Sequence, residues 1–486
     1  MGKTETLDER TTDMRSTEYP LELSTEQMVQ LVDEAMAKIA AHIASLPEQD
    51  MSYTEGGAEL ARAHVEDLPE TGTAYRELLH LIFEKLVTKT YNCASPGYLA
   101  YIPGGGLFHS AVADLIANSL NRYISVFVAA PGLIQLEINV ARWFCQMVGY
   151  PEDAQGQLTS GGSMANFIAI ATARRERLPE DFLKGTLYCS DQVHHSINKA
   201  AILAGFPADN IRVVPSNEDK QICLDRLRQQ VAADHRAGFE PFLVVGSAGT
   251  VNTGAVDDIA GLADLAEEHE LWLHIDGAYG GFFVLTGRGR DRLKGLGRAD
   301  SITLDPHKGL FLPYGTGCLL VRDGAALKRA QHVTGEYMPP MQDEPDLVDF
   351  SAISPELSRD FRGLRVWLPM KLHGVQVFRD ALEEKLDLAE WATRELSAID
   401  TMEVVTEPQL SIVTFRLHPP DLDESALNEL NRRLRDHINA KQRVFLTPTT
   451  LGGRYVIRIC VLNFRTHMDR MEMCLEDVRA SVAEVS

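Results

Sequence analysis

Two short apolar segments, each ending abruptly in charged or imidazole side chains, constrain the fold of this chain more than any other feature. The first, residues 272–279, carries Asp276, and the second, residues 301–308, carries Lys308. This pattern is typical of buried parallel strands, which are apolar on both faces and bear their polar residues at the carboxyl ends. We therefore expect Asp276 and Lys308 to meet at one edge of a parallel sheet.

Short strands and helices alternate from about residue 92 onward, which predicts an α/β fold with a mostly parallel central sheet and helices on both faces. The expected strands of this sheet are residues 157–159, 186–189, 211–214, 242–245, 271–275, 301–304 and 318–321. The C-terminal part has an α+β texture, with expected strands at 412–417 and 455–461 and expected helices at 424–440 and 470–482. A chain of 486 residues is long enough for more than one lobe.

We divide the chain into a helical N-terminal segment (residues 1–91), a large α/β domain (92–370) and a small C-terminal α+β domain (371–486). The N-terminal segment has apolar residues at helical spacing over 25–46 and 75–87, with Ser24 or Thr25 as the N-cap. It is too small to bury its own apolar faces, so we expect it to pack on another lobe or another subunit.

The composition argues against several classes of protein. A formal net charge of −22 disfavours nucleic acid and anionic membrane surfaces as partners. The seven cysteines are scattered and form no Cys-x-x-Cys pair, which predicts reduced thiols in a cytoplasmic protein and no metal site. The polar first 17 residues resemble neither a signal peptide nor a membrane anchor, and no apolar run is long enough to span a bilayer.

An aspartate and a lysine at one sheet edge suit pyridoxal 5'-phosphate (PLP). The lysine forms a Schiff base with this cofactor, and the aspartate keeps the pyridine nitrogen protonated so that the ring can accept electrons. Most lysines are solvated surface charges, but Lys308 is followed by the apolar, glycine-rich residues 309–318, which indicates a buried position. We expect burial to lower its pKa and to make it a usable amine nucleophile.

Other residues could complete such a site. Gly162 and Ser163 lie between a strand and a helix, where free N–H groups favour an anion such as a phosphate. The alternative is an ordinary glycine-rich turn with Ser163 as the N-cap. His194 follows another strand and could lie flat on a conjugated ring, or could be only a polar residue in a helix-initiating turn. Thr250 closes a further strand and offers a hydroxyl.

Three motifs resemble those of the group II PLP-dependent amino-acid decarboxylases, which include the aromatic-L-amino-acid and glutamate enzymes. They are Ser-Asp-Gln-Val-His at 190–194, His-Ile-Asp-Gly-Ala-Tyr at 274–279 and Asp-Pro-His-Lys at 305–308. The resemblance extends from about residue 95 to the final helix. It implies the fold type I architecture of PLP-dependent transferases, a homodimer with shared active sites, and decarboxylation of an L-amino acid to an amine.

The resemblance also implies a role for individual residues. Lys308 would be the Schiff-base lysine, Asp276 the partner of the pyridine nitrogen and His194 the histidine stacked on the ring. The remaining cofactor contacts would be Gly162, Ser163, Thr250, Ala278, Asp305 and His307.

This chain departs from the family pattern in places. Gly309 follows the Schiff-base lysine where the family often has tryptophan, and Gly97 replaces a residue that is commonly aromatic in the aromatic-substrate branch. Both changes suggest a differently shaped pocket.

A further departure concerns a lid. Residues 335–354 are rich in Pro, Asp and Glu, which favours a mobile loop over the site. In the family this loop carries a tyrosine that protonates the α-carbon. Counting back from the arginine-rich residues 359–365, that position falls on Phe350, which has no proton to give. Relatives with phenylalanine here resemble aldehyde synthases, in which the unquenched carbanion reacts with dioxygen. Alternatively Phe350 packs the lid, the register slips, or Tyr337 supplies the proton, and we favour simple decarboxylation.

The side chain of the substrate is less constrained. Tyr98, Tyr101, Tyr123 and Phe127 could line a pocket for an aromatic side chain or belong to the core. Arg458 and Arg465 could bind a carboxylate, but we favour surface ion pairs for both. An aromatic L-amino acid is weakly favoured.

Two other functions are possible on the same fold. A cofactor-free regulatory or binding relative is disfavoured because Ser163, His194, Asp276 and Lys308 are all present. An aminotransferase or another lyase is disfavoured by the Asp-x-His-Lys signature at 305–308.

Overall fold

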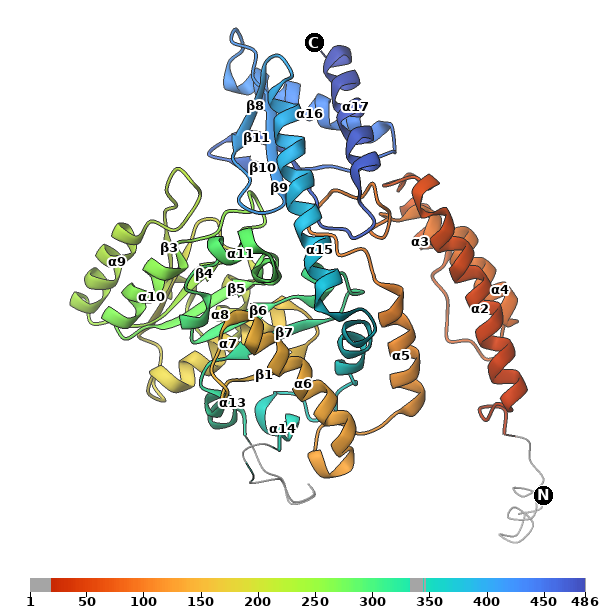
Figure 1. The fold of residues 1–486 in the computed structure, drawn as a ribbon, viewed down its shortest axis with the longest axis horizontal. Helices are drawn as coiled ribbons and strands as arrows, with labels where there is room; N and C mark the ends of the chain where they lie inside the picture. The colour runs from red at the N-terminus through yellow and green to blue at the C-terminus, as the bar shows by residue number, and fades with distance from the viewer. Residues whose placement is uncertain (1–18, 333–343, 345–346, 486) are drawn as a thin grey trace, which may run out of the picture. The chain divides into compact units, whose positions relative to one another are not determined.

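The computed structural model describes residues 19–332, 344 and 347–485. The chain divides into two compact units, Met1–Tyr91 and Asn92–Ser486. Figure 1 colours the first unit from red to orange and the second from orange to blue. Within the described ranges, no helix combines the length and the apolar character needed to cross a membrane.

The first unit is helical, as predicted. Its helices are α2 (Thr25–Ser45), η1 (Leu46–Glu48), α3 (Gly57–Ala63), α4 (Tyr75–Leu81), η2 (Ile82–Leu86) and η3 (Val87–Lys89). Ser24 caps α2 through a capping box with Gln27, which confirms the expected start of this helix. Helix α2 has no buried residue, so the apolar face of this unit remains exposed when the unit is taken by itself.

The second unit contains a seven-stranded sheet that includes every strand predicted for the large domain. Its strands lie in the order β1-β7-β6-β5-β4-β2-β3, and only β7 runs antiparallel to its neighbours. Their bounds are β1 (Gln155–Thr159), β2 (Gly185–Ser190), β3 (Ile211–Val214), β4 (Glu240–Ser247), β5 (Trp272–Gly277), β6 (Ser301–Leu304) and β7 (Gly317–Val321). The predicted α/β fold with a mostly parallel sheet is confirmed.

Alternate residues of these strands enter two different hydrophobic clusters, one on each face of the sheet. In β4, Val244 belongs to one cluster, whereas Leu243 and Val245 belong to the other. Helices α9 (Leu224–Arg236) and α10 (Ile259–Glu268) pack into the first cluster, and α7 (Gly162–Arg177) and α8 (Ser196–Leu203) into the second. The expected helices on both faces are therefore present (Figure 1).

The other helices of this unit surround the sheet or connect its strands. They are α5 (Phe108–Leu120), η4 (Phe127–Ala129), α6 (Pro131–Val148), η5 (Ala208–Asn210), η6 (Gly281–Leu285), α11 (Gly287–Arg292), η7 (Leu296–Arg298), α12 (Pro306–Gly309), α13 (Gly324–Gln331), α14 (Phe350–Ile353) and α15 (Gly363–Ser397). Helix α15 kinks at Gly374, whose φ is 71°. The domain boundary expected after residue 370 lies inside this helix.

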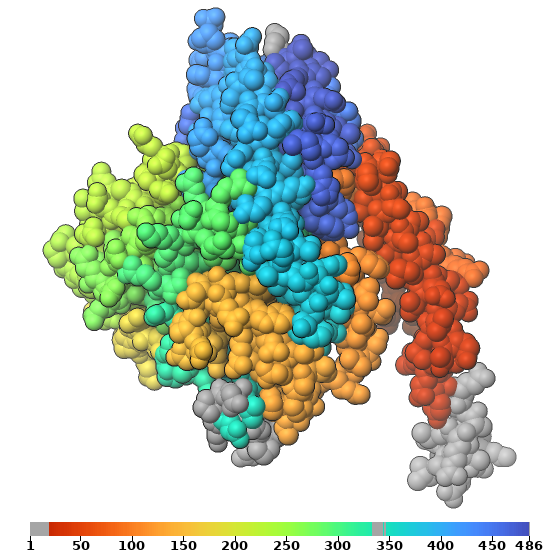
Figure 2. Space-filling view, viewed as in Figure 1, coloured from red at the N-terminus to blue at the C-terminus, as the bar shows by residue number. Residues whose placement is uncertain are grey.

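The C-terminal segment forms a second, antiparallel sheet with a third hydrophobic cluster, which confirms its α+β character. The sheet order is β10-β11-β9-β8. Its elements are β8 (Met402–Thr406), β9 (Ile412–Leu417), α16 (Glu424–Ala440), β10 (Thr447–Leu451), β11 (Arg454–Cys460) and α17 (Met468–Val485). Figure 2 shows this segment in blue at one end of the second unit.

Candidate active site

One cavity of about 430 Å³ lies where the carboxyl ends of β1, β2, β4, β5 and β6 meet. In an open α/β sheet this edge is where ligands bind. All nine residues predicted to contact the cofactor line this cavity: Gly162, Ser163, His194, Thr250, Asp276, Ala278, Asp305, His307 and Lys308. Asp276 and Lys308 thus meet at one edge of the sheet.

Lys308 lies in the four-residue helix α12, directly after β6. Its Nζ forms an ion pair with Asp305 Oδ2 at 2.8 Å. Burial acts to lower the pKa of Lys308, but Asp305 and Asp276 outweigh this effect, so the pKa is raised. The predicted lowering is wrong for this structure because it considered burial without the two carboxylates. The amine must give up a proton and its ion pair with Asp305 before it can act as a nucleophile.

The turn before α7 fits a phosphate group. Helix α7 begins at Gly162 with Gly161 as its N-cap and no side-chain cap, so its first N–H groups lack helical partners. A Cβ at Gly162 would lie 3.0 Å from Asp305 Oδ2 and 3.1 Å from Ala278 Cβ, so the turn is closed to larger residues. The alternative with Ser163 as the N-cap is wrong, since Ser163 already lies in the first turn.

The carboxylates of Asp276 and Asp305 and the N-terminus of α7 are groups that could bind PLP. Asp305 Oδ1 is buried and has no hydrogen-bond partner among the described residues, so it is available to a bound group. Asp276 Oδ1 accepts from the N–H of Ala278, and its Oδ2 accepts from Asn166 Nδ2. Thr250 is buried in the loop that follows β4 and lines the cavity. The residues present therefore fit a cofactor that carries a phosphate, an aldehyde and a pyridine nitrogen.

Burial sets the protonation state of the two histidines that line the cavity, His194 and His307. It lowers the pKa of His194 despite the opposing effect of Asp276, and it lowers the pKa of His307 despite Asp305. His307 Nδ1 lies 2.6 Å from the carbonyl oxygen of Thr316, so Nδ1 carries the hydrogen and donates it.

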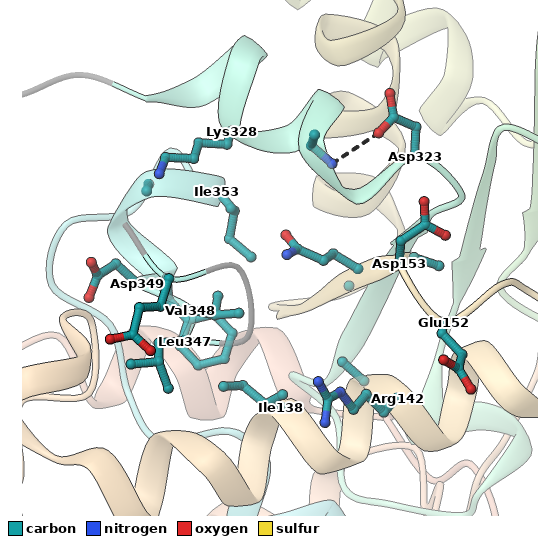
Figure 3. Close-up of a pocket in the computed structure, with 18 residues that line it drawn as sticks. Ile138, Arg142, Glu152, Asp153, Asp323, Lys328, Leu347, Val348, Asp349 and Ile353 are labelled. Carbon is teal, nitrogen blue, oxygen red and sulfur yellow. Dashed lines mark hydrogen bonds between the residues drawn. The ribbon is translucent and has the colours of Figure 1, made fainter. Parts of the chain in front are cut away.

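Phe350 is not brought into this site. It opens α14 with its side chain buried in the core, where the Arg359 guanidinium lies 4.6 Å above its ring. It lines a different cavity of about 630 Å³ between α6, α13 and α14, where Val348 and Asp349 also lie (Figure 3). Tyr337, the alternative proton donor, lies outside the described residues.

The four aromatic residues considered for substrate binding lie in different environments. Tyr101 lines the cavity, whereas Tyr98 is buried against Phe445. Phe127 packs against a core cluster, and Tyr123 is exposed and donates to the carbonyl of Leu357.

The surface ion pairs favoured for the two arginines are wrong. Arg458 is buried and donates to the carbonyl of Asn252 at 3.0 Å and to Thr447 Oγ1 at 3.2 Å. Arg465 is half-buried and donates to the carbonyl of Ala94 at 3.2 Å. Neither arginine lines the cavity that contains Lys308.

The sequence analysis assigned no role to several residues that the fold brings to the cavity. They are Ile102, Met164, Asn166, Ser196, Ser247, Val251, Tyr279 and Tyr314. Asn166 was detectable in principle, because it is a polar residue one helical turn after Gly162 on a face of α7 that is otherwise apolar.

The fold and the site together define a PLP-dependent enzyme of fold type I. The model of the pyridoxal-dependent decarboxylase conserved domain matches residues 58–418. The aromatic-L-amino-acid decarboxylase of Bacillus atrophaeus is 36% identical over 468 residues, which cover 96% of this chain and 98% of the relative. The chain therefore belongs to the pyridoxal-dependent decarboxylase family.

Solved structures agree with this assignment. Oryza sativa TDC with PLP and tryptamine has a TM-score of 0.91 and 25% identity, covering 96% of this chain and 99% of the other. Catharanthus roseus tryptophan decarboxylase in complex with L-tryptophan has a TM-score of 0.90 and 26% identity, covering 96% and 100%. The protein is a PLP-dependent amino-acid decarboxylase, and PLP is its cofactor.

Proposed function

We propose that this enzyme decarboxylates an aromatic L-amino acid to the corresponding amine, with Lys308 as the residue that holds the cofactor. The observation that carries the proposal is the convergence of Lys308, Asp276 and the α7 turn in one cavity. When bound, PLP accepts into its ring the electron pair released as the carboxylate leaves as carbon dioxide.

Each residue proposed to contact the cofactor has a role that follows from its position. Lys308 anchors the cofactor aldehyde, and Asp276 holds the pyridine nitrogen and stabilises its positive charge. The N–H groups at the start of α7, with Ser163, bind the phosphate. His194 covers the ring, and its lowered pKa keeps the imidazole neutral near pH 7. Thr250, Ala278, Asp305 and His307 complete the walls of the site.

The lining of the cavity supports an aromatic substrate. Tyr101, Ile102, Met164, Val251 and Tyr314 supply its apolar and aromatic surface. Among the described lining residues, Lys308 is the single lysine or arginine, and it is committed to the cofactor. An acidic side chain on the substrate would therefore lack a cation, whereas an aromatic ring would have stacking surfaces. The curated relative that acts on aromatic L-amino acids supports the same class.

A second candidate function rests on Phe350, whose ring cannot donate a proton to the α-carbon. The reaction would then consume dioxygen and water with the amino acid, and release an aldehyde, carbon dioxide, ammonia and hydrogen peroxide in equal amounts. Tyr314 nevertheless lines the cavity, and a tyrosine phenol keeps its proton at neutral pH and can donate it. This phenol favours the amine as product.

An aerobic incubation of the PLP-loaded enzyme with a panel of L-amino acids tests both functions. Amine, aldehyde and hydrogen peroxide are followed together, and we expect amine from aromatic substrates without peroxide. Aldehyde with matching peroxide would establish the second function instead. Tyr314→Phe should shift the product from amine toward aldehyde if Tyr314 supplies the proton.

Borohydride reduction followed by peptide mass analysis tests the anchoring residue independently of turnover. The cofactor should be found attached to the peptide that contains Lys308, and Lys308→Ala should abolish the attachment. Attachment to another lysine would contradict the proposed role of Lys308.

A further inference from the structure

Asn166 is the centre of a buried polar network behind the cofactor cavity. It lies on the second turn of α7 and is 1% exposed. Its Nδ2 donates to Asp276 Oδ2 and to Ser196 Oγ, each at 3.0 Å. Its Oδ1 accepts from Thr303 Oγ1 at 2.7 Å and lies 3.0 Å from His274 Nε2. One amide thus connects β5, β6 and α8 to α7.

The amide of Asn166 has only one workable orientation. A carboxylate oxygen accepts hydrogen bonds, so the group that faces Asp276 must be the NH₂. The oxygen then faces Thr303 and His274, and His274 must carry its hydrogen on Nε2. Both hydrogens and both acceptor positions of Asn166 are used, so rotation of the amide would break four contacts in a dry environment.

A chain of donors reaches Asp276 through His274. Burial lowers the pKa of His274 to about 4, so the imidazole is neutral near pH 7 and its Nδ1 is an acceptor. Ser301 Oγ lies 2.8 Å from this Nδ1 and itself accepts from Trp272 Nε1 at 2.8 Å. The hydrogen bonds therefore run from Trp272 to Ser301, to His274 and to Asn166, and end on Asp276.

A second branch leads from Asn166 to the face of the cofactor. The backbone N–H of Ser196 donates to His194 Nδ1 at 3.3 Å, so this nitrogen is an acceptor and the imidazole hydrogen lies on Nε2. Ser196 Oγ lies 2.8 Å from the same nitrogen and accepts from Asn166 Nδ2. The hydroxyl hydrogen of Ser196 is therefore left to point at His194.

We propose that Asn166 is a positioning residue for the cofactor, because its single amide aligns Asp276 at the pyridine nitrogen and directs the hydroxyl hydrogen of Ser196 toward His194 Nδ1. The inference rests on the roles proposed above for Asp276 and His194. With Oδ2 held by Asn166 and Oδ1 by the N–H of Ala278, the Asp276 carboxylate cannot rotate away from the ring.

The test compares Asn166→Ala with Asp276→Asn and with a buried asparagine far from the cavity. Asn431 is fully buried in the C-terminal segment and makes three hydrogen bonds to the backbone of Leu417 and Leu427, so Asn431→Ala is the matched control. For each variant we would measure the dissociation constant of PLP, the visible circular dichroism of bound PLP and the Tm of the cofactor-free protein. A hydrogen bond to a charged group contributes enough free energy to change the affinity for PLP about 10- to 100-fold.

We expect Asn166→Ala to weaken PLP binding by about that factor and to change the visible circular dichroism. Asn431→Ala should lower only the Tm. The double variant Asn166→Ala/Asp276→Asn should weaken PLP binding by less than the sum of the two single losses, because both changes act on the contact at Asp276. Ser196→Ala, which cuts only the branch to His194, should alter the spectrum, and an unchanged spectrum would overturn that branch.

The outcomes separate this inference from the proposed function. If Asp276→Asn leaves affinity and spectrum unchanged, the role of Asp276 itself fails. If Asp276→Asn changes both while Asn166→Ala lowers only the Tm, Asn166 is purely structural and this inference alone is overturned.

Discussion

At the scale of single residues, the neutral state of His274 has a consequence for stability. Burial lowers the pKa of His274 to about 4, whereas in the unfolded chain the imidazole has its ordinary value of about 6.5. Between these values the unfolded chain binds a proton that the folded chain does not. The contribution of His274 to stability is therefore complete above about pH 6.5 and is lost as the pH falls toward 4.

We predict that His274→Gln makes the decline of Tm between pH 6.5 and 4.5 shallower, since glutamine can donate to Asn166 and accept from Ser301 without titrating. The native histidine accounts for up to about 3 kcal/mol over this range. Differential scanning fluorimetry across a pH series measures the effect, with exposed His235→Gln as the control. Parallel curves for His274→Gln and the native protein would contradict the prediction.

The site could be predicted from the sequence where chemistry and local position coincide. Asp276 lies at the end of one apolar strand, Lys308 follows another, and Gly162 and Ser163 open a helix, so their types and neighbours suffice to place them. The role of Asn166 could not be predicted in this way, because its partners Asp276 and Thr303 lie more than a hundred residues away along the chain. The pKa of Lys308 was mispredicted for a similar reason, since burial can be inferred from a sequence more readily than the arrangement of nearby carboxylates.

At the scale of elements, a buried ion pair ties the segment before α15 to the strand that carries the phosphate turn. Arg359 and Glu137 have fully buried side chains, and Arg359 Nη2 lies 2.6 Å from Glu137 Oε1. The same Nη2 donates to the carbonyl of Leu158 at 2.9 Å. Glu137 Oε2 accepts from the first N–H of α15 at Gly363. The end of β1 is therefore held in place from α6 and α15 together.

We predict that Glu137→Gln destabilises the protein by about 3–5 kcal/mol, because it leaves a buried guanidinium with only the more distant Glu356 carboxylate, 3.9 Å from Arg359 Nε. The double variant Glu137→Leu/Arg359→Met should lose less than the sum of the two single changes. The shift of the urea midpoint measures both effects. As the control, Glu176→Gln breaks the half-exposed pair with Arg329 and should cost about 1 kcal/mol or less. Equal losses for Glu137→Gln and Glu176→Gln would contradict the prediction.

The strands that sequence reasoning missed are the two edge strands of the C-terminal sheet. Strands β8 and β10 form the two edges of the C-terminal sheet. Every residue of β8 is only half-buried, and β10 contains Pro448, which cannot donate to a neighbouring strand. The central strands β9 and β11 are almost entirely buried and mostly apolar, although β9 contains Arg416 and β11 contains Arg458. Burial on both faces makes β9 and β11 recognisable, and the partly exposed strands β8 and β10 lack that signal.

At the scale of the whole molecule, the second unit exposes apolar side chains along α5. Leu115, Ile116 and Leu120 are each more than 40% exposed, and Ile116 and Leu120 lie one helical turn apart on the same face. Exposed Tyr123 and Val128 follow the helix. A contiguous patch of exposed apolar side chains on a protein surface often marks an interaction site. This supports the prediction of a homodimer, which the family resemblance implied.

We predict that the enzyme sediments with twice the 53.9 kDa mass of one chain, and that Ile116→Glu shifts it toward the mass of the single chain. A carboxylate buried in an apolar interface would lose its hydration without gaining an ionic partner. The free-energy cost of this desolvation exceeds the stabilisation that the contacts of Ile116 provide. Val213→Glu is the control, because Val213 is also exposed but lies on edge strand β3, across the sheet from α5 in Figure 1. If the active sites are shared, Ile116→Glu should also weaken PLP binding, whereas Val213→Glu should not. A native protein that sediments as a single chain, or an Ile116→Glu variant that stays dimeric, would assign the exposed face of α5 to another role.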